Sequence, residues 1–253
     1  MVKSFDDLWK EEVSNSVKDF ESMSFRDSHS NGVLDQPITL AEVSHVVKAI
    51  KNNKSAGSDG IVGELIKYGG KPMCEMLLAL FNIVWDSEYA PSYWREGLIV
   101  SLFKNGDRED PGNYRGITLL NVVGKLYSRV INNRLLKHLE LNHLLHEGQG
   151  GFRMGRSCID NIFSLSELIQ GRIREGKSTF SFFLDVKKAY DTVWRDGLWY
   201  KMWEMGIKGK LWRVVRSLYA NNRSCVFLEG KSSEFFQLIK GLPRVAHCCP
   251  HCF

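Results

Sequence analysis

Apolar residues recur along much of this chain with the spacing of one face of an α-helix. After residue 39 they return every three or four positions, at Val43, Val46, Val47 and Ile50. Thr39 and Glu42 stand at the separation of a capping box, which marks the first turn of a helix. This pattern predicts a helix that begins after Thr39 and stops at 51–54. Further helices are predicted near 64–68, 73–87, 122–140, 158–175, 197–205 and 209–220.

Shorter apolar runs between these helices predict strands. Residues 98–103 form one run and residues 180–186 another, and a hairpin is predicted from 226–229 and 235–238 around the turn Gly230-Lys231-Ser232. No internal repeat or low-complexity linker divides the chain. Helices mixed with several strands, without regular alternation of strand and helix, indicate an α+β fold.

The composition is that of a globular, mildly basic protein. The chain has 253 residues, of which 43% are hydrophobic and 25% charged, and its net charge of +5 permits a polyanionic partner without requiring one. No apolar run is long enough to span a membrane, and the N-terminus lacks the apolar core of a signal peptide. We therefore expect an intracellular protein that is kept in a reducing compartment, in which the scattered Cys74, Cys158 and Cys225 are free thiols.

The run from Phe182 to Asp191 carries the clearest chemical signal. Three apolar residues lead into Asp185, and an aromatic residue, Tyr190, precedes a second aspartate, Asp191. A carboxylate at the end of a buried strand suits Mg²⁺, which binds one or two protein carboxylates together with substrate phosphate oxygens. Two such ions drive nucleotidyl transfer. A solitary aspartate after a strand is more often a turn or helix-cap residue, so the assignment depends on the other segments.

Three basic segments also have two interpretations each. Residues 104–108 and 113–120 fit either a hairpin whose cations grip a triphosphate or a solvated basic loop. Residues 149–157, with several glycines and two arginines, fit either a phosphate-contacting loop or a flexible connection. The predicted helix from Lys125 to His138 is basic along its exposed face, which fits either a nucleic-acid contact or a solvated surface.

Taken together and in this order, the segments resemble the reverse transcriptases of non-LTR (LINE-type) retrotransposons. The likeness spans residues 37–240 and rests on 54–61, 113–120 with 133–135 downstream, 148–157 with Asp160, and 183–191. It implies a right-hand polymerase fold with fingers and an incomplete palm, the thumb being absent from this chain. The implied divisions are a polar lead-in at 1–30, a fingers-like region at 31–177, a partial palm at 178–240 and an aberrant tail at 241–253.

The resemblance also implies roles for individual residues. Asp185 is the expected catalytic, metal-binding carboxylate, and the carbonyl of Val186 helps to hold the metal. Tyr190 lies under the sugar of the nucleotide, while Arg115 and Lys104 hold its triphosphate. The residues expected to contact nucleic acid are Gln149, Gly151, Arg153, Arg156, Arg129, Arg134 and Lys137. The implied cofactor is Mg²⁺, and the implied partners are an RNA template, a DNA primer and dNTPs. The resemblance also implies that the protein resides in the nucleus or the cytoplasm. Lys187 and Asp191 are expected to form local ion pairs.

The end of the chain departs from the family. There the next segments are a loop with a Gln-Gly pair and a hairpin with an Ala-Asp-Asp core, neither of which occurs in residues 241–253. A shifted reading frame of the codons for this tail can restore the loop, so we hypothesise a frameshift near Lys240. The alternative is a zinc site, although its ligands would be closer in sequence than structural sites usually allow: His247, Cys248, Cys249, His251 and Cys252.

Because one carboxylate cannot assemble a two-metal site, we expect a polymerase fragment that is inactive in this chain and poorly soluble. The alternative is a non-catalytic nucleic-acid-binding protein that reuses the fingers. An interaction scaffold is a third possibility, for which the sequence has no specific sign, and the sequence leaves the oligomeric state open.

Overall fold

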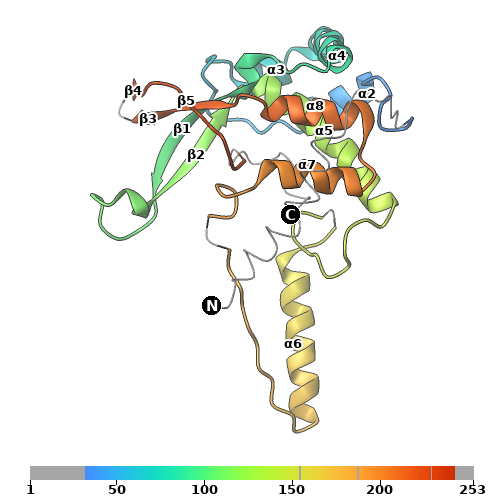
Figure 1. Ribbon diagram of the computed structural model, residues 1–253, viewed down its shortest axis with the longest axis vertical. Helices are drawn as coiled ribbons and strands as arrows, with labels where there is room; N and C mark the ends of the chain where they lie inside the picture. Colours follow the sequence, from blue (N-terminus) through green and yellow to red (C-terminus); the bar gives the residue numbers. More distant parts are fainter. Residues whose placement is uncertain (1–31, 154, 187, 229, 243–253) are drawn as a thin grey trace.

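A small mixed sheet and a set of helices around it form the body of the protein, and one helix projects from that body (Figure 1). The computed structural model describes residues 32–153, 155–186, 188–228 and 230–242. The polar lead-in predicted at 1–30 therefore lies outside the described residues, as does the chain after residue 242.

The sheet joins two segments that are far apart in the sequence. Strand β1 (Glu96–Phe103) pairs antiparallel with β2 (Tyr114–Leu120), from Gly97 opposite Leu120 to Phe103 opposite Tyr114. On its other side β1 lies parallel to β3 (Arg223–Leu228). Strands β4 (Lys231–Ser232) and β5 (Phe236–Gln237) both pair antiparallel with β3, so the predicted C-terminal hairpin is confirmed as one edge of a larger sheet.

The predicted helices of the body all form. Their bounds are α2 (Leu40–Lys48), α3 (Gly63–Lys67), α4 (Gly70–Ser87), α5 (Val122–Leu141), α7 (Arg195–Glu204) and α8 (Gly209–Tyr219), with short 3-10 turns η1 (Ser92–Arg95) and η2 (Pro111–Asn113). The capping box at Thr39 and Glu42 is present at the start of α2. In the part of the chain that the structure describes, no helix has the length and apolar character needed to cross a membrane.

Helix α5 supplies much of the hydrophobic core. Its buried apolar side chains include Leu126, Tyr127, Val130, Ile131, Leu135 and Leu139. The ring of Tyr127 lies 5.3 Å from that of Phe81 on α4 and 5.2 Å from that of Trp94 in η1. Gly124 lets the helix approach η1 closely, because a Cβ atom at that position would lie 2.8 Å from the Cβ of Trp94. The core thus fixes the start of α5 against η1, the turn that leads into β1.

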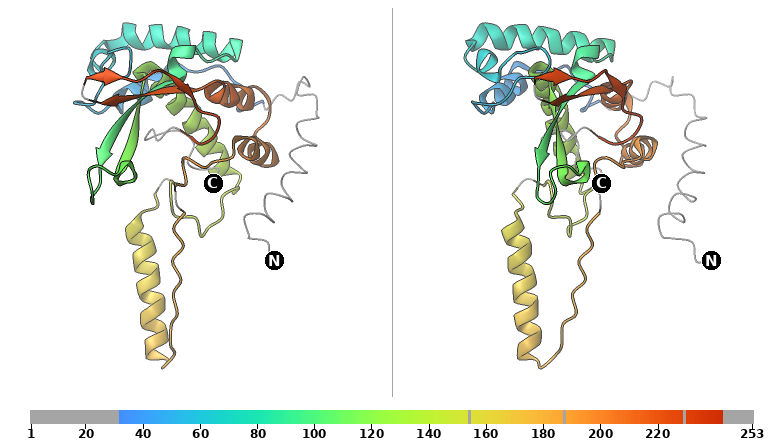
Figure 2. Two further views of the ribbon diagram at one scale, coloured as in Figure 1. Left: turned by 60° about the vertical axis from the view of Figure 1, so that its left-hand side comes forward. Right: turned by 90° about the vertical axis from the view of Figure 1, so that its left-hand side faces the viewer.

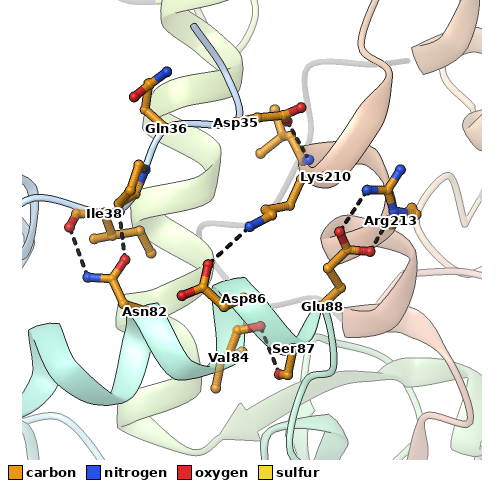
Figure 3. Close-up of polar contacts among 12 residues, drawn as sticks. Asp35, Gln36, Ile38, Asn82, Val84, Asp86, Ser87, Glu88, Lys210 and Arg213 are labelled. Carbon is orange, nitrogen blue, oxygen red and sulfur yellow. Dashed lines mark hydrogen bonds and ion pairs between the residues drawn. The ribbon is translucent and has the colours of Figure 1, made fainter. Parts of the chain in front are cut away.

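Polar contacts connect α4 to segments that are distant in sequence (Figure 3). Asn82 exchanges two hydrogen bonds with the backbone of Ile38, which anchors the segment before α2. At the C-terminal end of α4, the Nζ atom of Lys210 lies 3.0 Å from Oδ1 of Asp86, and Arg213 donates two hydrogen bonds to the C-cap residue Glu88. These pairs hold α8 beside α4 and so carry β3, which follows α8, to its place next to β1.

Helix α6 (Cys158–Arg174) lies outside the body with the chain that returns from it (Figures 1 and 2). We call residues 158–186 the arm. None of the 17 residues of α6 is buried. The strand predicted at 180–186 is wrong: this segment has no strand pairing, and Phe180 and Leu184 are 96% and 80% exposed. The physical reason is that a strand needs a neighbouring strand, and none of the described strands reaches this segment.

Candidate nucleotide and nucleic-acid site

The β1–β2 hairpin brings Lys104 and Arg115 to the same face. Arg115 is paired with Leu102, and the backbone N–H of Lys104 donates to the carbonyl of Asn113 at 2.9 Å, so the antiparallel register continues to that position. Because side chains alternate between the two faces of a strand, residues 102 and 104 share a face with residues 113 and 115. Both cationic side chains are exposed. The hairpin therefore presents two positive charges to solvent on one surface.

The opposite face of the hairpin is stiffened by aromatic contacts. The rings of Phe103 and Tyr114 lie 5.4 Å apart, and the guanidinium carbon of Arg108 lies 5.3 Å from the ring centre of Phe103. The hydroxyl of Tyr114 donates to the carbonyl of Arg108, and the side chain of Asn113 donates to the carbonyl of Asp107, each at 2.9 Å. These contacts thus brace the loop at 104–113, which forms the end of the β1–β2 hairpin. Arg108, to which the sequence assigned no role, is part of that brace.

The two arginines of the loop at 149–157 are engaged with carboxylates. Arg153 donates from Nε and Nη2 to the two oxygens of Glu140, at 3.0 and 2.8 Å, and its side chain is only 8% exposed. Arg156 lies 2.6 Å from Glu147. Gln149 is half-buried and Gly151 exposed. Arg153 thus connects the loop to the end of α5, whereas Arg156 connects it to the segment that follows α5, and much of their charge is neutralised within the protein.

The basic residues of α5 divide into two groups. Arg134 donates to Glu42 and to the carbonyls of Gln36 and Pro37, lies over the ring of Trp85, and is 11% exposed. It is therefore part of the packing between α5 and α2. Lys137 is exposed and Arg129 half-exposed.

The start of α5 is fixed by the loop at 54–61. The side-chain amide of Asn121 donates to Oδ2 of Asp59, and Oδ1 of Asn121 accepts from the N–H groups of Val123 and Gly124. Burial lowers the pKa of Lys125, and the nearby charge of Asp59 acts in the opposite direction. The first turn of α5 thus holds a partly desolvated lysine next to an aspartate, which sequence reasoning did not predict.

The expected metal residues lie in the returning chain of the arm. Asp185 is exposed, and Val186 is also exposed. Tyr190 is half-buried in the turn that follows, and its carbonyl accepts a hydrogen bond from the N–H of Leu242 at 2.7 Å. Among the described residues no three His, Cys, Asp or Glu side chains gather as a metal-binding group. As the described chain stands, its donor set does not fit a two-metal centre. Lys187 and its expected ion pair lie outside the described residues.

A set of hydrogen bonds that the sequence did not reveal holds residues 241 and 242 beside Tyr190. We call this set of contacts the latch. Arg195 donates from Nε to the carbonyl of Gly241 and from Nη1 to that of Tyr219. The N–H of Gly241 donates to Val193 at 2.9 Å. Gly241 has a φ of +78°, and a Cβ atom there would lie 2.7 Å from the carbonyl oxygen of Asp191, so only glycine fits.

Leu242, the last residue that the structure describes, is buried. Gly241 and Leu242 are thus packed as part of the folded chain, although our expectation placed them in the aberrant tail. The proposed frameshift products from 243 onward, and the cluster of His and Cys residues, lie outside the described residues.

A family profile described as reverse transcriptase (RNA-dependent DNA polymerase) matches residues 103–253, more than half of the chain. The match begins at the end of β1 and takes in β2, α5, the arm and the latch. The profile describes a class of template-copying nucleic-acid polymerases, and the chain belongs to the reverse transcriptase family.

Similar proteins come from mobile elements. The chain is 28% identical over 215 residues to a probable RNA-directed DNA polymerase from transposon X-element of Drosophila melanogaster, covering 83% of this chain and 24% of that protein. It is 27% identical over 208 residues to the RNA-directed DNA polymerase from mobile element jockey of the same species, covering 82% and 23%.

A third relative is a putative 115 kDa protein in the type-1 retrotransposable element R1DM of Drosophila melanogaster, 32% identical over 62% of this chain and 15% of that protein. The predicted resemblance to non-LTR retrotransposon polymerases is confirmed. The chain spans about a quarter of the length of the first two relatives.

Proposed function

We propose that this chain forms the fingers and the first part of the palm of a retrotransposon RNA-directed DNA polymerase, with the fingers at 31–177 and the partial palm at 178–240. The observation that carries the proposal is the common exposed face of Lys104 and Arg115 on the braced β1–β2 hairpin. Arg115 can hold two phosphate oxygens through parallel hydrogen bonds, while Lys104 supplies a point charge beside it. The substrate of this surface is the triphosphate of an incoming dNTP.

The remaining assigned residues complete the proposal. Reverse transcriptases generally use divalent metal ions and bind an RNA template and a primer. We assign Asp185 and the Val186 carbonyl to the metal, and Tyr190 to the sugar of the nucleotide. The template and primer then lie along a surface formed by Gln149, Gly151, Arg129 and Lys137. Arg134, Arg153 and Arg156 have internal partners and contribute to that surface mainly by holding its shape.

Binding of a fluorescent dNTP analogue tests the role of the hairpin. Because hydrogen bonds to charged groups are worth about 1.5–3 kcal/mol, Arg115→Ala should weaken binding by roughly tenfold or more, and Arg115→Lys should restore only part of it. Lys71→Ala, which removes an exposed lysine of α4, is the control and should bind as the parent chain does. Equal binding by the parent chain and Arg115→Ala would contradict the assignment.

A second function, nucleic-acid binding without catalysis, is favoured by the exposed position of Asp185 away from any described carboxylate cluster. Primer extension by the 253-residue chain separates the two. We expect binding of an RNA–DNA hybrid without extension, because the donor set for two metals is not assembled. Extension that is abolished by Asp185→Ala would establish a complete polymerase site and reject the second function.

A further inference from the structure

An apolar stripe runs along the exposed surface of α6. Four of its large side chains recur at helical spacing and are 64–75% exposed: Ile159, Ile162, Phe163 and Ile173. The smaller Ser166 lies midway along the stripe, and Ile169 continues it. Soluble proteins rarely leave a contiguous apolar surface of this kind exposed unless it serves an interaction. The stripe therefore needs a partner of matching shape.

The stripe has nearly the same arrangement when it is read from either end. Ile159 and Ile173 each lie seven residues from Ser166, and Phe163 and Ile169 each lie three residues from it. At these four positions an antiparallel copy of α6 would thus present large side chains opposite large ones, with Ser166 near the middle and Gln170 opposite Ile162. A surface that complements itself in this way is the requirement for a two-fold symmetric interface.

Charge along α6 favours the same partner and fixes its direction. The first turn carries Asp160 and the last turn carries Arg172 and Arg174. In an antiparallel pair the acidic end of each helix lies beside the basic end of the other, whereas a parallel pair would place like charges together. The helix dipoles favour the antiparallel arrangement as well. Arg172 donates to the carbonyl of Ser178 and Arg174 to that of Gln170, and both side chains remain exposed.

From the stripe and the charges together we propose that α6 is a self-association surface, on which a second copy of this chain docks with its own α6 antiparallel. A helix of 17 residues is about 25 Å long. One pair of such helices forms a smaller contact than the roughly 1,600 Å² of a standard interface. The dimer should accordingly be concentration-dependent, with a dissociation constant in roughly the micromolar range.

Sedimentation equilibrium of the 253-residue chain, at roughly 1–100 µM, tests the proposal. Phe163→Glu places a charge in the stripe and should raise the dissociation constant at least tenfold. Ser164→Glu is the matched control, because it adds the same charge one residue along, on the opposite face of the helix, and it should leave the dimer intact. Both positions are exposed, so neither change disturbs the folded body; circular dichroism checks that the helix content is unchanged.

Three results would overturn the proposal. A monomer at every concentration would assign the stripe to another protein or to another part of a longer chain. Equal loss of association in Phe163→Glu and Ser164→Glu would show that the stripe is not the contact. Open-ended aggregation that Phe163→Glu does not reduce would show non-specific association through other apolar surfaces.

Disulfide cross-linking tests the direction of the pair. Cys158 is exposed at the start of α6, and Ile173→Cys adds a thiol near its end, in a chain whose Cys74, Cys248, Cys249 and Cys252 are serine and whose Cys225 is buried. Mild oxidation should join residue 158 of one copy to residue 173 of the other, as identified by peptide mass spectrometry. Bonds that mainly join 158 to 158 would indicate parallel helices and contradict the antiparallel arrangement.

Discussion

At the scale of single residues, Gly57 shows how a sequence motif acts through close packing. A Cβ atom on Gly57 would lie 2.7 Å from both the carbonyl carbon of Leu120 and the backbone nitrogen of Asn121. These atoms belong to the backbone, where β2 ends and α5 begins, so they cannot move aside as a flexible side chain would. The loop at 54–61 thus supports the junction between the hairpin and the basic helix.

Gly57→Ala should therefore destabilise the protein by about 2 kcal/mol, a typical cost of overpacking. Gly171→Ala is the control, because no atom lies within 4 Å of the added methyl group and alanine favours the helix; it should be neutral or stabilising by roughly 0.5 kcal/mol. Urea unfolding followed by circular dichroism measures both. If the two variants unfolded at the same urea concentration, the close approach of Gly57 to the backbone of Leu120 and Asn121 would not constrain the fold.

At the scale of elements, Glu42 links two helices. Its carboxylate caps α2 through the N–H of Thr39 and also accepts two hydrogen bonds from Arg134 of α5. Burial raises the pKa of Glu42, but the hydrogen bonds from Arg134 and Thr39 and the charge of Arg134 outweigh that effect, and the pKa lies below its ordinary value of 4.5. The folded state therefore favours the ionised carboxylate.

A lowered pKa in the folded state means that Glu42 contributes stability above pH 4.5, and that this contribution is lost as the pH falls through the folded pKa. Glu42→Gln should be less stable than the parent chain at pH 7, and the difference should narrow below about pH 4.5. Glu75→Gln, which alters an exposed pair with Lys71, should change little at either pH. A difference for Glu42→Gln that stays constant between pH 7 and pH 3.5 would contradict this account.

The segment at 180–186 shows why one element could not be predicted from its own residues. Its alternation of Ser181 with phenylalanines and its apolar run up to Asp185 are typical of a strand. Pairing, however, depends on a neighbour that the segment does not encode, and the chain there is extended and exposed instead. By contrast, the helix after Thr39 forms as predicted because its cap and its apolar face are both local.

At the scale of the whole molecule, the surface charge is smaller than the count of basic residues suggests. Arg153 and Arg134 are held by Glu140 and Glu42, whereas Lys137 is exposed on α5. A buried, paired arginine releases few counterions from a nucleic acid, because most of its charge is already balanced. The expected binding surface therefore depends on the exposed lysines and arginines rather than on the total of +5.

The salt dependence of RNA–DNA hybrid binding tests this division. Lys137→Ala should reduce the slope of log affinity against log salt by about 1, as expected for the loss of one phosphate contact. Arg153→Gln should leave that slope nearly unchanged, while it lowers stability because Glu140 loses its partner. Fluorescence anisotropy over a salt series gives the slope for each variant. A larger reduction of the slope in Arg153→Gln than in Lys137→Ala would show that Arg153 contacts the nucleic acid directly.

The sequence by itself determined the helices, the C-terminal hairpin and the family. Each of these depends on residues close to one another, such as Thr39 with Glu42, or on short motifs whose order along the chain is visible without a structure. The common face of Lys104 and Arg115 did not follow from the sequence, because it depends on the register of β1 and β2 across the loop at 104–113, which the structure supplies.

Only the tertiary structure decided which charges face solvent and which elements find neighbours. The partners of Arg134 and Arg195 are as many as 98 and 46 residues away in the sequence, so no local pattern reveals that these side chains are structural. The parallel pairing of β1 with β3 joins residues more than 120 positions apart for the same reason. Burial and long-range pairing arise from the packing of the whole chain, and they separate a basic residue that can bind a ligand from one that holds the fold together.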